Sequence, residues 1–379
     1  MGKKSDKKVL FLASWYPSKE NTTTGNFVQK HAELANEVSN IDVLYATVSK
    51  SVEEITVVDE LINNVRTVIV YYPPIKSNVP FLSTILKKET YLFALRKGYK
   101  YLDTQYDLVH LNAAFPAGLF AKWLKKQFNI PYIVTVHWSG FLTHNFVYDS
   151  LPFYIKRAYQ SIFRSANKVL PVSDHLGKSL KERGLINEFT VLNNVVKSTY
   201  FYPNVEQKSE MSSNRFLHIS TFDNDHKNIS GMLSSFSKLK KKYVLHLVTE
   251  GEKSDVWTLI KKYNIPKENC VVESKLPAEK IGEAMRAADC LVSFSNYETF
   301  SVVLAEAWMS GIPAIYSKCG GLTEINNVRI GVQVQPKDQE ALSEALEYFS
   351  RMNYDSISIC DFAEQFSETY VKKMFCSLY

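Results

Sequence analysis

Several sequence signals are missing from this chain of 379 residues, and each absence removes a class of protein. The five cysteines all lie in the second half and none forms a CxxC pair, so we expect neither a disulfide framework nor a zinc site. No run of eighteen apolar residues occurs, and the charged N-terminus precedes an apolar run too short for a signal peptide or membrane span. We therefore expect a cytoplasmic protein, either free or associated with the inner face of a membrane.

The glycine-rich loops of common nucleotide-binding domains are also missing. The first predicted strand, residues 9–13, runs into a polar loop at residues 14–26 whose only glycine is Gly25. A dinucleotide-binding domain would carry GxGxxG here, and the chain contains neither GxxxxGKS nor GxxxxGKT. These absences argue against an NAD or FAD site and against a P-loop.

What the chain does have is an uneven distribution of charge. Its 45% apolar and 22% charged residues are typical of a soluble globular protein, and its length is sufficient for two domains. Residues 1–200 contain 25 Lys and Arg against 16 Asp and Glu, whereas the remainder contains 20 against 23. The basic half suits an acidic partner. Its basic and aromatic stretch at 81–101 fits either contact with an anionic membrane or acceptor, or a solvated amphipathic helix. No nucleic-acid partner is predicted.

Strand and helix patterns alternate in two series, with no repeat of solenoid length. Strands of the first series are predicted at 41–48, 65–70, 108–110, 132–136, 168–172 and 190–192, and those of the second at 216–219, 244–248, 271–272, 290–294, 313–316 and 331–334. The polar stretch at 203–210 between the two series is predicted to be a linker. Strands alternating with helices predict an α/β protein with two doubly wound parallel sheets, in domains at residues 1–200 and 201–360.

The second series is organised around residues 290–316. Two short apolar runs enclose a predicted helix at 301–310, which Gly311 ends with a left-handed cap and Pro313 keeps from continuing. In a parallel unit, the unpaired N–H groups and positive dipole end of such a helix favour an anion, so we expect a phosphate there. Glu298 precedes the helix and Glu306 lies about two turns inside it, where both can accept hydrogen bonds from hydroxyls. This arrangement suits a nucleoside diphosphate sugar.

The same stretch resembles the donor-binding region of glycosyltransferase family 4, whose members have the GT-B fold. The resemblance is carried by Glu298 and Glu306 in SNYETFSVVLAEAWMSGIPAI, and by Gly320, Gly321 and Glu324 after it. Weaker matches, including DLVHLNAAFPAG, VTVHWSG and VLNNVV, extend it over most of the chain. It implies two Rossmann-like domains facing across a cleft, the first on the acceptor side and the second holding the donor. Residues 361–379 would form a helix, from about Phe362, that packs back on the first domain.

The resemblance also implies an activity and the residues that carry it. The activity is retaining transfer of a hexose-type sugar from a nucleotide diphosphate donor, without a required metal. The acceptor would be a glycan or a lipid-linked molecule, as in polysaccharide or lipopolysaccharide biosynthesis. Catalytic roles fall on Glu298, against the donor sugar, and on His137, which approaches from the other domain. Donor contacts fall on Lys227, Glu306, Phe300, Ser301, Val302, Gly25, Asn26 and Glu324.

One departure from the family pattern concerns the diphosphate. Family members often have an arginine ahead of the lysine, and Ser220-Thr221-Phe222 stands in its place here. Neutralisation of the phosphates then rests on Lys227 and the helix terminus, with Lys253 or His226 as further candidates. Two alternative functions stay open: a catalytically weak nucleotide-sugar-binding protein, and an epimerase or phosphorylase on the same fold.

Each candidate residue also has a purely structural interpretation. Glu298 could cap a helix, His137 could be a buried histidine at a strand end, and Lys227 could be a surface residue at the start of a helix. Asp223-Asn224-Asp225 has the spacing of a metal motif from a different glycosyltransferase fold, but it lies in a loop here and no metal site is predicted. The histidines within strands, His110, His218 and His246, are predicted to lie in the core.

Overall fold

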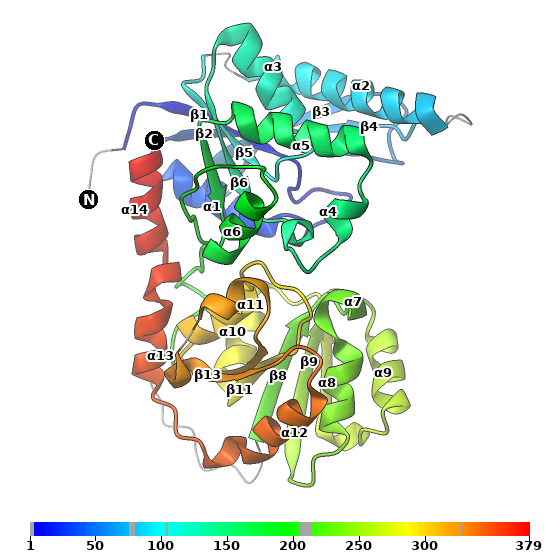
Figure 1. Cartoon of the computed structure of the whole chain (residues 1–379), viewed down its shortest axis with the longest axis vertical. Helices are drawn as coiled ribbons and strands as arrows, with labels where there is room; N and C mark the ends of the chain where they lie inside the picture. Colours follow the sequence, from blue (N-terminus) through cyan, green and yellow to red (C-terminus); the bar gives the residue numbers. More distant parts are fainter. Residues whose placement is uncertain (1–3, 76–79, 103–104, 205–213, 326) are drawn as a thin grey trace. The chain divides into compact units, whose positions relative to one another are not determined.

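The computed structural model describes residues 4–75, 80–102, 105–204, 214–325 and 327–379. The chain forms two compact units: unit 1 comprises Met1–Asn194 and Val371–Tyr379, and unit 2 comprises Val195–Tyr370. Each unit contains one sheet with helices against it (Figure 1). The division between the units therefore falls before residue 200, and most of the predicted linker at 203–210 lies outside the described residues.

Unit 1 is built on a seven-stranded sheet in the order β3-β4-β2-β1-β5-β6-β7. Its strands are β1 (Lys8–Ala13), β2 (Asn40–Val48), β3 (Thr56–Ile62), β4 (Val65–Tyr72), β5 (Leu108–Asn112), β6 (Tyr132–Val136) and β7 (Lys168–Pro171). The neighbouring strands are parallel except β3 and β4, which form an antiparallel pair at the edge. Residues 9–13 of β1 are fully buried, as expected for a central parallel strand covered on both faces.

The helices of unit 1 divide between the two faces of this sheet. They are α1 (Asn26–Asn36), α2 (Pro80–Tyr99), α3 (Gly118–Phe128), α4 (Val147–Ser150), α5 (Phe153–Ser165) and α6 (Asp174–Glu182). The connection from β1 to β2 runs in one direction across the sheet, and those from β4 through β7 run in the other. Because parallel crossovers are right-handed, α1 covers one face while α2, α3 and α5 cover the opposite face.

Unit 2 is built on a six-stranded parallel sheet in the order β10-β9-β8-β11-β12-β13. Its strands are β8 (Asn214–Ser220), β9 (Tyr243–Thr249), β10 (Cys270–Ser274), β11 (Cys290–Ser293), β12 (Ala314–Ser317) and β13 (Gly331–Val334). Its helices are α7 (Asn224–Lys227), α8 (Ile229–Phe236), α9 (Lys253–Lys262), α10 (Ala278–Ala287), α11 (Val302–Met309), α12 (Gln339–Tyr348) and α13 (Ser356–Ala363). Phe216, Phe236 and Phe294 are among the fully buried side chains of its core.

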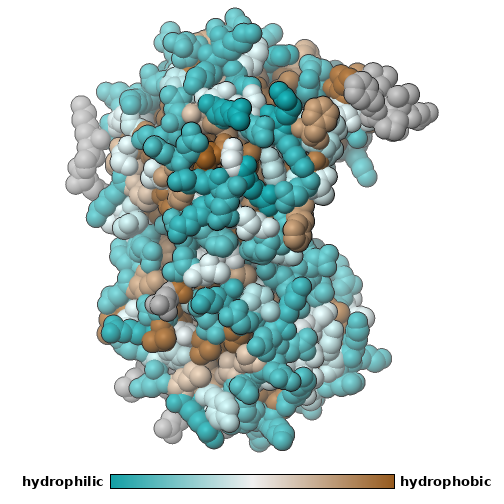
Figure 2. All heavy atoms as spheres, in the orientation of Figure 1, coloured by the Kyte–Doolittle hydropathy of each residue, from teal (hydrophilic) through white to brown (hydrophobic). Residues whose placement is uncertain are grey.

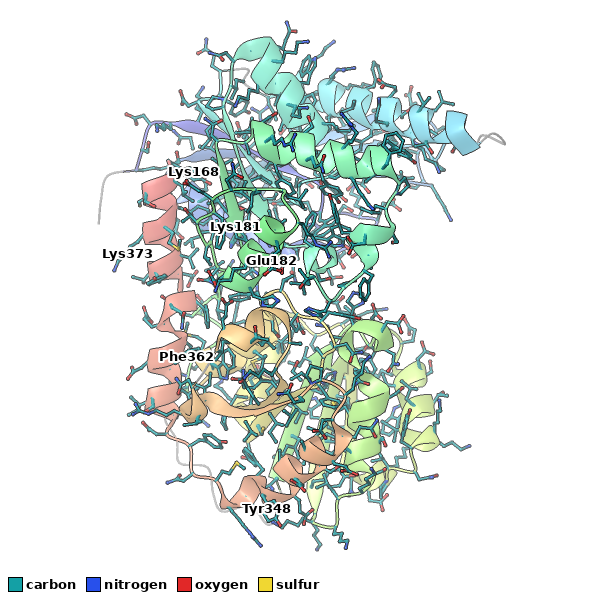
Figure 3. The ribbon with its side chains drawn as sticks, in the orientation of Figure 1. Lys168, Lys181, Glu182, Tyr348, Phe362 and Lys373 are labelled. Atoms are coloured by element: carbon teal, nitrogen blue, oxygen red, sulfur yellow. The ribbon has the colours of Figure 1, made fainter. Side chains whose placement is uncertain are left out.

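The terminal segment folds as two helices and not as one helix from Phe362. The first, α13, ends at Ala363, and beyond it the N–H of Val196 donates to the carbonyl of Phe366 at 2.9 Å. Phe362, labelled in Figure 3, packs against Trp308 of α11 with 5.4 Å between ring centroids. Packing against α11 and the bond from Val196 hold α13 within unit 2.

The second terminal helix, α14 (Glu368–Leu378), belongs to unit 1 from Val371 onward. Val371 and Phe375 are fully buried, and the Phe375 ring centroid lies 5.5 Å from that of His31 on α1. The hydroxyl of Tyr379 lies 2.5 Å from Nδ1 of His110 on β5. None of the described helices is both long and apolar enough to cross a bilayer.

Three predictions about strands were wrong or incomplete. Residues 190–192 are not a strand, although the N–H groups of Thr190 and Leu192 donate to carbonyls of β7. Strand β3 was not predicted, because its sequence TVVDELI has no fully buried face. His110 and His218 are buried as predicted, but His246 is only half-buried: its Nε2 lies 2.6 Å from Oε2 of Glu273 on the edge strand β10.

Candidate functional site

The direction of the chain connections in unit 2 reverses between the adjacent strands β8 and β11. Strand β8 is followed by β9 and β10 on one side, and β11 by β12 and β13 on the other. Ligands of open α/β sheets bind at the carboxyl ends of the strands at such a reversal. The segment after β8 contains Lys227, and the loop after β11 contains Ser295 and Glu298. The topology of the sheet thus brings three polar side chains together.

The carboxylate of Glu298 is the centre of this group. Its Oε1 accepts a hydrogen bond from Nζ of Lys227 at 2.7 Å and another from Oγ of Ser295 at 2.9 Å. The Lys227 side chain is 27% exposed and that of Glu298 is 9% exposed. Oε2 of Glu298 accepts no hydrogen bond from the described residues, and the ammonium group has two further N–H donors. Both partners therefore keep hydrogen-bonding capacity for a ligand.

The sequence suggested that Lys227 lies at the start of a helix. In the structure it is instead the last residue of the short helix α7. The single turn α7 is separated from the next helix, α8, because Asn228 between them adopts the left-handed conformation with φ 48°. Oδ1 of Asn228 accepts from the N–H of Gly231 at 3.2 Å and so caps α8. The break after Lys227 directs its side chain toward the loop that follows β11.

Two hydrogen bonds tie the α7 segment to the loop after β11. Asn296 donates its backbone N–H to the carbonyl of His226 at 2.7 Å and its Nδ2 to the carbonyl of Asp225 at 2.9 Å. Asp223 caps α7 by accepting from the N–H of Asp225 at 3.0 Å, and its other oxygen lies 2.7 Å from Nδ1 of His226. These bonds fix the two segments against each other and so hold Lys227 beside Glu298.

The N-terminus of α11 lies directly after Glu298 in the chain. Ser301 precedes the helix with φ 67° and ψ 84° and makes no side-chain capping bond, so the first-turn N–H groups lack a side-chain cap. Such a left-handed conformation is strained for a residue other than glycine, and strain of this kind is found at functional sites. Phe300 is buried against Phe366, with ring centroids 5.1 Å apart. Its side chain is therefore unavailable to a ligand, and only its backbone groups can contact one.

The turn after β12 completes the support of Glu298. This turn is η3 (Gly320–Glu324), and the N–H of Gly321 donates to the carbonyl of Glu298 at 3.0 Å. Glu324 at its end is exposed, whereas Glu306 within α11 is buried. The Gly-Gly pair therefore positions the backbone of Glu298.

In unit 1, the candidate His137 follows strand β6 and is 7% exposed. Neither of its ring nitrogens has a hydrogen-bond partner among the described residues, and its ring centroid lies 4.5 Å from that of Phe27. Burial, with smaller effects of His31 and His110, lowers the pKa of His137 well below its usual 6.5. The imidazole is therefore neutral near pH 7 and can donate one hydrogen bond and accept another.

Gly25 precedes α1 with φ 73°, a conformation that favours glycine. A Cβ at this position would lie 2.5 Å from the carbonyl carbon of Trp15, closer than real contacts allow. Asn26, the first residue of α1, is exposed. Gly25 thus permits the loop after β1 to fold tightly against the start of α1.

Two family models match this chain. The model of the glycosyl transferases group 1 matches residues 204–368, and that of Glycosyltransferase Family 4 matches residues 33–199. The chain belongs to the family 4 glycosyltransferases. It is accordingly a transferase of the GT-B fold, and the matched ranges cover most of both units.

Individual relatives agree with this assignment of the glycosyltransferase. TuaC of Bacillus subtilis strain 168, named as a glycosyltransferase of teichuronic acid biosynthesis, is 25% identical over 287 residues, 73% of this chain and 69% of that protein. Sucrose-phosphate synthase from Thermosynechococcus elongatus has a TM-score of 0.71 at 18% identity, covering 97% of this chain and 95% of its own. Anabaena HepE in complex with UDP-glucose has a TM-score of 0.70 at 14% identity and covers 98% of both chains. The two structures show the likeness of fold.

The predicted site residues of the glycosyltransferase fall in both units. Lys227 and Glu298 are in direct contact, and Ser301, Val302 and Glu306 lie at or within α11. Glu324 is exposed on η3. His137, Gly25 and Asn26 belong to unit 1. Their joint action with the residues of unit 2 stays a prediction.

Two residues of the glycosyltransferase site were missed from the sequence. Ser295 donates to the Glu298 carboxylate, and Asn296 ties its loop to α7. Both stand within the SNYE run, and the spacing of a serine three residues before a glutamate is the signal that could have indicated Ser295. The carboxylate of Asp223, part of the apparent metal motif, is occupied by the α7 cap and His226. Over the described ranges, no three potential metal ligands gather.

Proposed function

We propose that this protein is a retaining glycosyltransferase that moves a hexose-type sugar from a nucleoside diphosphate donor to a glycan or lipid-linked acceptor in cell-surface polysaccharide or lipopolysaccharide biosynthesis. The observation that carries the proposal is the contact of Lys227 and Ser295 with Glu298 beside the N-terminus of α11. A cation, a carboxylate and helix N–H groups are the groups that a sugar diphosphate requires. The name of the relative TuaC supports the proposed role in polysaccharide biosynthesis.

The proposed chemistry depends on the charge of the leaving group. As the bond from the sugar C1 to the diphosphate oxygen breaks, its electron pair leaves with the diphosphate. Lys227 and the N–H groups at the start of α11 stabilise that charge, which is the main source of rate enhancement in sites of this type. The acceptor hydroxyl forms the new bond to C1, and its proton passes to the departing diphosphate. No residue is assigned as a covalent nucleophile.

The remaining candidates hold the two substrates in this proposal. The free Oε2 of Glu298 accepts from a sugar hydroxyl, and Glu306 accepts from the ribose. Neutral His137 donates to, or accepts from, the transferred sugar. Gly25 and Asn26 contact the donor in this proposal. Donor binding requires Lys227 to share its N–H groups between Glu298 and a phosphate, which its two unused donors allow.

A thermal-shift screen tests the donor proposal. Unfolding temperatures would be compared with UDP, GDP, ADP and CDP, with UDP-glucose as the first sugar nucleotide because HepE binds it. A ligand at about one hundred times its Kd adds about 2.7 kcal/mol of stability, which corresponds to several degrees for a unit of this size. Lys227→Met should abolish the shift, whereas Lys280→Met, on the exposed face of α10, should retain it. No shift with any nucleotide would contradict the proposal.

We further propose that phosphate neutralisation by Lys227 and α11 makes a divalent metal unnecessary. Turnover in excess EDTA should then equal turnover with added Mg²⁺ or Mn²⁺. An activity that EDTA abolishes and added metal restores would contradict this proposal, because it would show that a divalent metal ion neutralises the diphosphate.

A second candidate function is nucleotide-sugar binding with weak catalysis. The observation that favours it is Thr221, which is exposed in the segment after β8 where family members often have an arginine. Calorimetry that shows nucleotide binding, together with no turnover with a defined acceptor, would support this alternative. Thr221→Arg should then raise turnover, because it supplies the missing charge.

A further inference from the structure

One face of the unit 1 sheet is covered by three adjacent helices whose charges are almost all positive. Helix α2 carries four Lys or Arg residues, α3 three and α5 three, and Glu89 is the one acid in their sequences. The helices adjoin in space: Arg96 of α2 lies 5.3 Å from the Trp123 ring of α3, and Lys122 of α3 hydrogen-bonds Ser161 of α5. Figure 1 shows the three helices side by side. We call this surface the α2-α3-α5 face.

The charge of the α2-α3-α5 face is largely uncompensated. Lys126, Arg157 and Arg164 are exposed, and none of them pairs with an acid among the described residues. Glu89 is itself paired with Lys88 at 2.9 Å. Clustered cations of this kind create a positive potential that attracts anionic surfaces.

A cavity between α3 and α5 adds a place for an anionic group. It measures about 490 Å³ and is lined by Leu119, Lys122, Trp123, Lys125, Lys126 and Ser165. Lys125 donates to the carbonyl of Ser165 at 2.8 Å and to Oδ1 of Asn167 at 3.0 Å, which leaves one of its three N–H donors for a ligand. Three ammonium groups beside one cavity suit a phosphate.

Exposed aromatic side chains stand among these cations. Phe153 is 74% exposed and Tyr154 47% at the start of α5, Phe128 is 47% exposed at the end of α3, and Phe93 is 57% exposed on α2. Figure 2 shows hydrophobic side chains among the hydrophilic ones in this part of the molecule. A soluble polyanion would need only the cations. A lipid surface uses both kinds of group, because aromatic rings enter the interface while basic side chains contact anionic headgroups.

We propose that the α2-α3-α5 face docks on a membrane containing anionic lipids. Lys126, Arg157 and Arg164 contact the headgroups, and Phe153 and Tyr154 enter the interfacial region. This inference goes beyond the proposed function, because it holds for any sugar donor. It also assigns the surface to three helices, whereas the sequence had indicated only the stretch at 81–101.

Vesicle co-sedimentation tests the basic part of the face. The full chain should bind vesicles of phosphatidylcholine mixed with phosphatidylglycerol much more strongly than vesicles of phosphatidylcholine alone, and added salt should weaken the binding. The triple variant Lys126→Gln, Arg157→Gln, Arg164→Gln should bind on the order of a hundredfold more weakly. The control variant Lys238→Gln, Lys240→Gln, Lys261→Gln makes the same change of charge at exposed positions of unit 2. It should bind like the wild type.

A second pair of variants separates a membrane from a soluble polyanion. Phe153→Ser with Tyr154→Ser should weaken vesicle binding about tenfold and leave binding to soluble polyphosphate unchanged. The control is Val328→Ser with Ile357→Ser, at positions of unit 2 that are 83% and 71% exposed. It should leave both kinds of binding unchanged.

Three results would overturn the proposal: no preference for phosphatidylglycerol, an equal loss of binding in the unit 2 charge control, or full vesicle binding by the aromatic variant. Full vesicle binding by the aromatic variant, together with strong polyphosphate binding, would identify the face as a site for soluble polyanions. Turnover with soluble substrates should be the same in all variants. A negative vesicle result would therefore leave the donor proposal standing.

Discussion

Replacing Lys227 with methionine removes the cation from a nearly buried carboxylate. The Nζ of Lys227 lies 2.7 Å from Oε1 of Glu298, with side chains 27% and 9% exposed. Exposed ion pairs contribute about 0.2–1 kcal/mol to stability, and breaking a fully buried pair costs about 3–5 kcal/mol. This partly buried pair should fall between these limits, so Lys227→Met should cost about 1–3 kcal/mol. Ser295 continues to donate to the same carboxylate oxygen, which limits the loss.

A double-mutant cycle measures the coupling of this pair. Glu298→Gln together with Lys227→Met removes both charges, so the double variant should recover about 1–2 kcal/mol relative to the sum of the single losses. Urea unfolding of the four proteins gives the free energies. The exposed pair Lys280–Glu283, at 2.7 Å and with side chains 56% and 47% exposed, provides the control. Solvent screens that pair, so its cycle should show little coupling.

Turnover decides whether Lys227 has a role besides pairing with Glu298. Loss of a charge-stabilising donor costs about 10²–10³ in rate, and Lys227→Met should lower turnover by this factor. The double variant should recover stability but not turnover, because the diphosphate still lacks its cation. Recovery of turnover in the double variant, or a single variant within a few-fold of the wild type, would refute the assignment of Lys227 to the phosphates.

Two further predictions concern unit 1. Gly25→Ala should lower the free energy of unfolding by more than about 2 kcal/mol, because alanine is strained in the left-handed conformation and its Cβ would also overlap the backbone of Trp15. Gly184→Ala, at φ 64° with open space around the added Cβ, should lower the free energy of unfolding by less. Equal losses of stability in the two variants would show that the overlap at Gly25 has no effect. Burial lowers the pKa of His31 to about 4 and that of His110 to about 3, and that of His137 also falls well below 6.5. Below about pH 6.5 these histidines bind protons in the unfolded chain but not in the folded one. The free energy of unfolding should therefore be highest above that pH and should fall by about 1 kcal/mol per histidine for each pH unit below it. Urea unfolding from pH 7.5 to 5.5 measures this, and a flat profile would contradict it.

The centre of unit 2 could be predicted because its signals are local. Gly311 indicated the end of α11, and the structure gives it φ 71° directly after the C-cap residue Ser310. The alternation of strands and helices predicted the parallel strands of both sheets, since buried parallel strands appear as short apolar runs. The place of Glu298 before α11 followed from the same pattern.

The rest depended on contacts that no local pattern specifies. The left-handed conformation of Asn228 divides α7 from α8 and so decides where Lys227 points. The hydrogen bond from Ser295 to Glu298 depends on how the loop after β11 turns. The pairing of His246 with Glu273 depends on β10 being an edge strand, which is a property of the whole sheet. Strand β3 has no fully buried face, so its sequence lacks the alternation of apolar and polar residues by which a strand can be predicted.

The central claim is that Glu298 acts on a nucleotide-sugar donor, and one measurement tests it most directly. Release of nucleoside diphosphate from a panel of sugar nucleotides would be followed with wild-type protein and with Glu298→Gln, which keeps the shape of the side chain and its bond from Ser295. We predict that the wild type consumes at least one donor and that the variant, still folded at the assay temperature, is about a hundredfold slower or more. Consumption of no donor, or equal rates for the two proteins, would contradict the account.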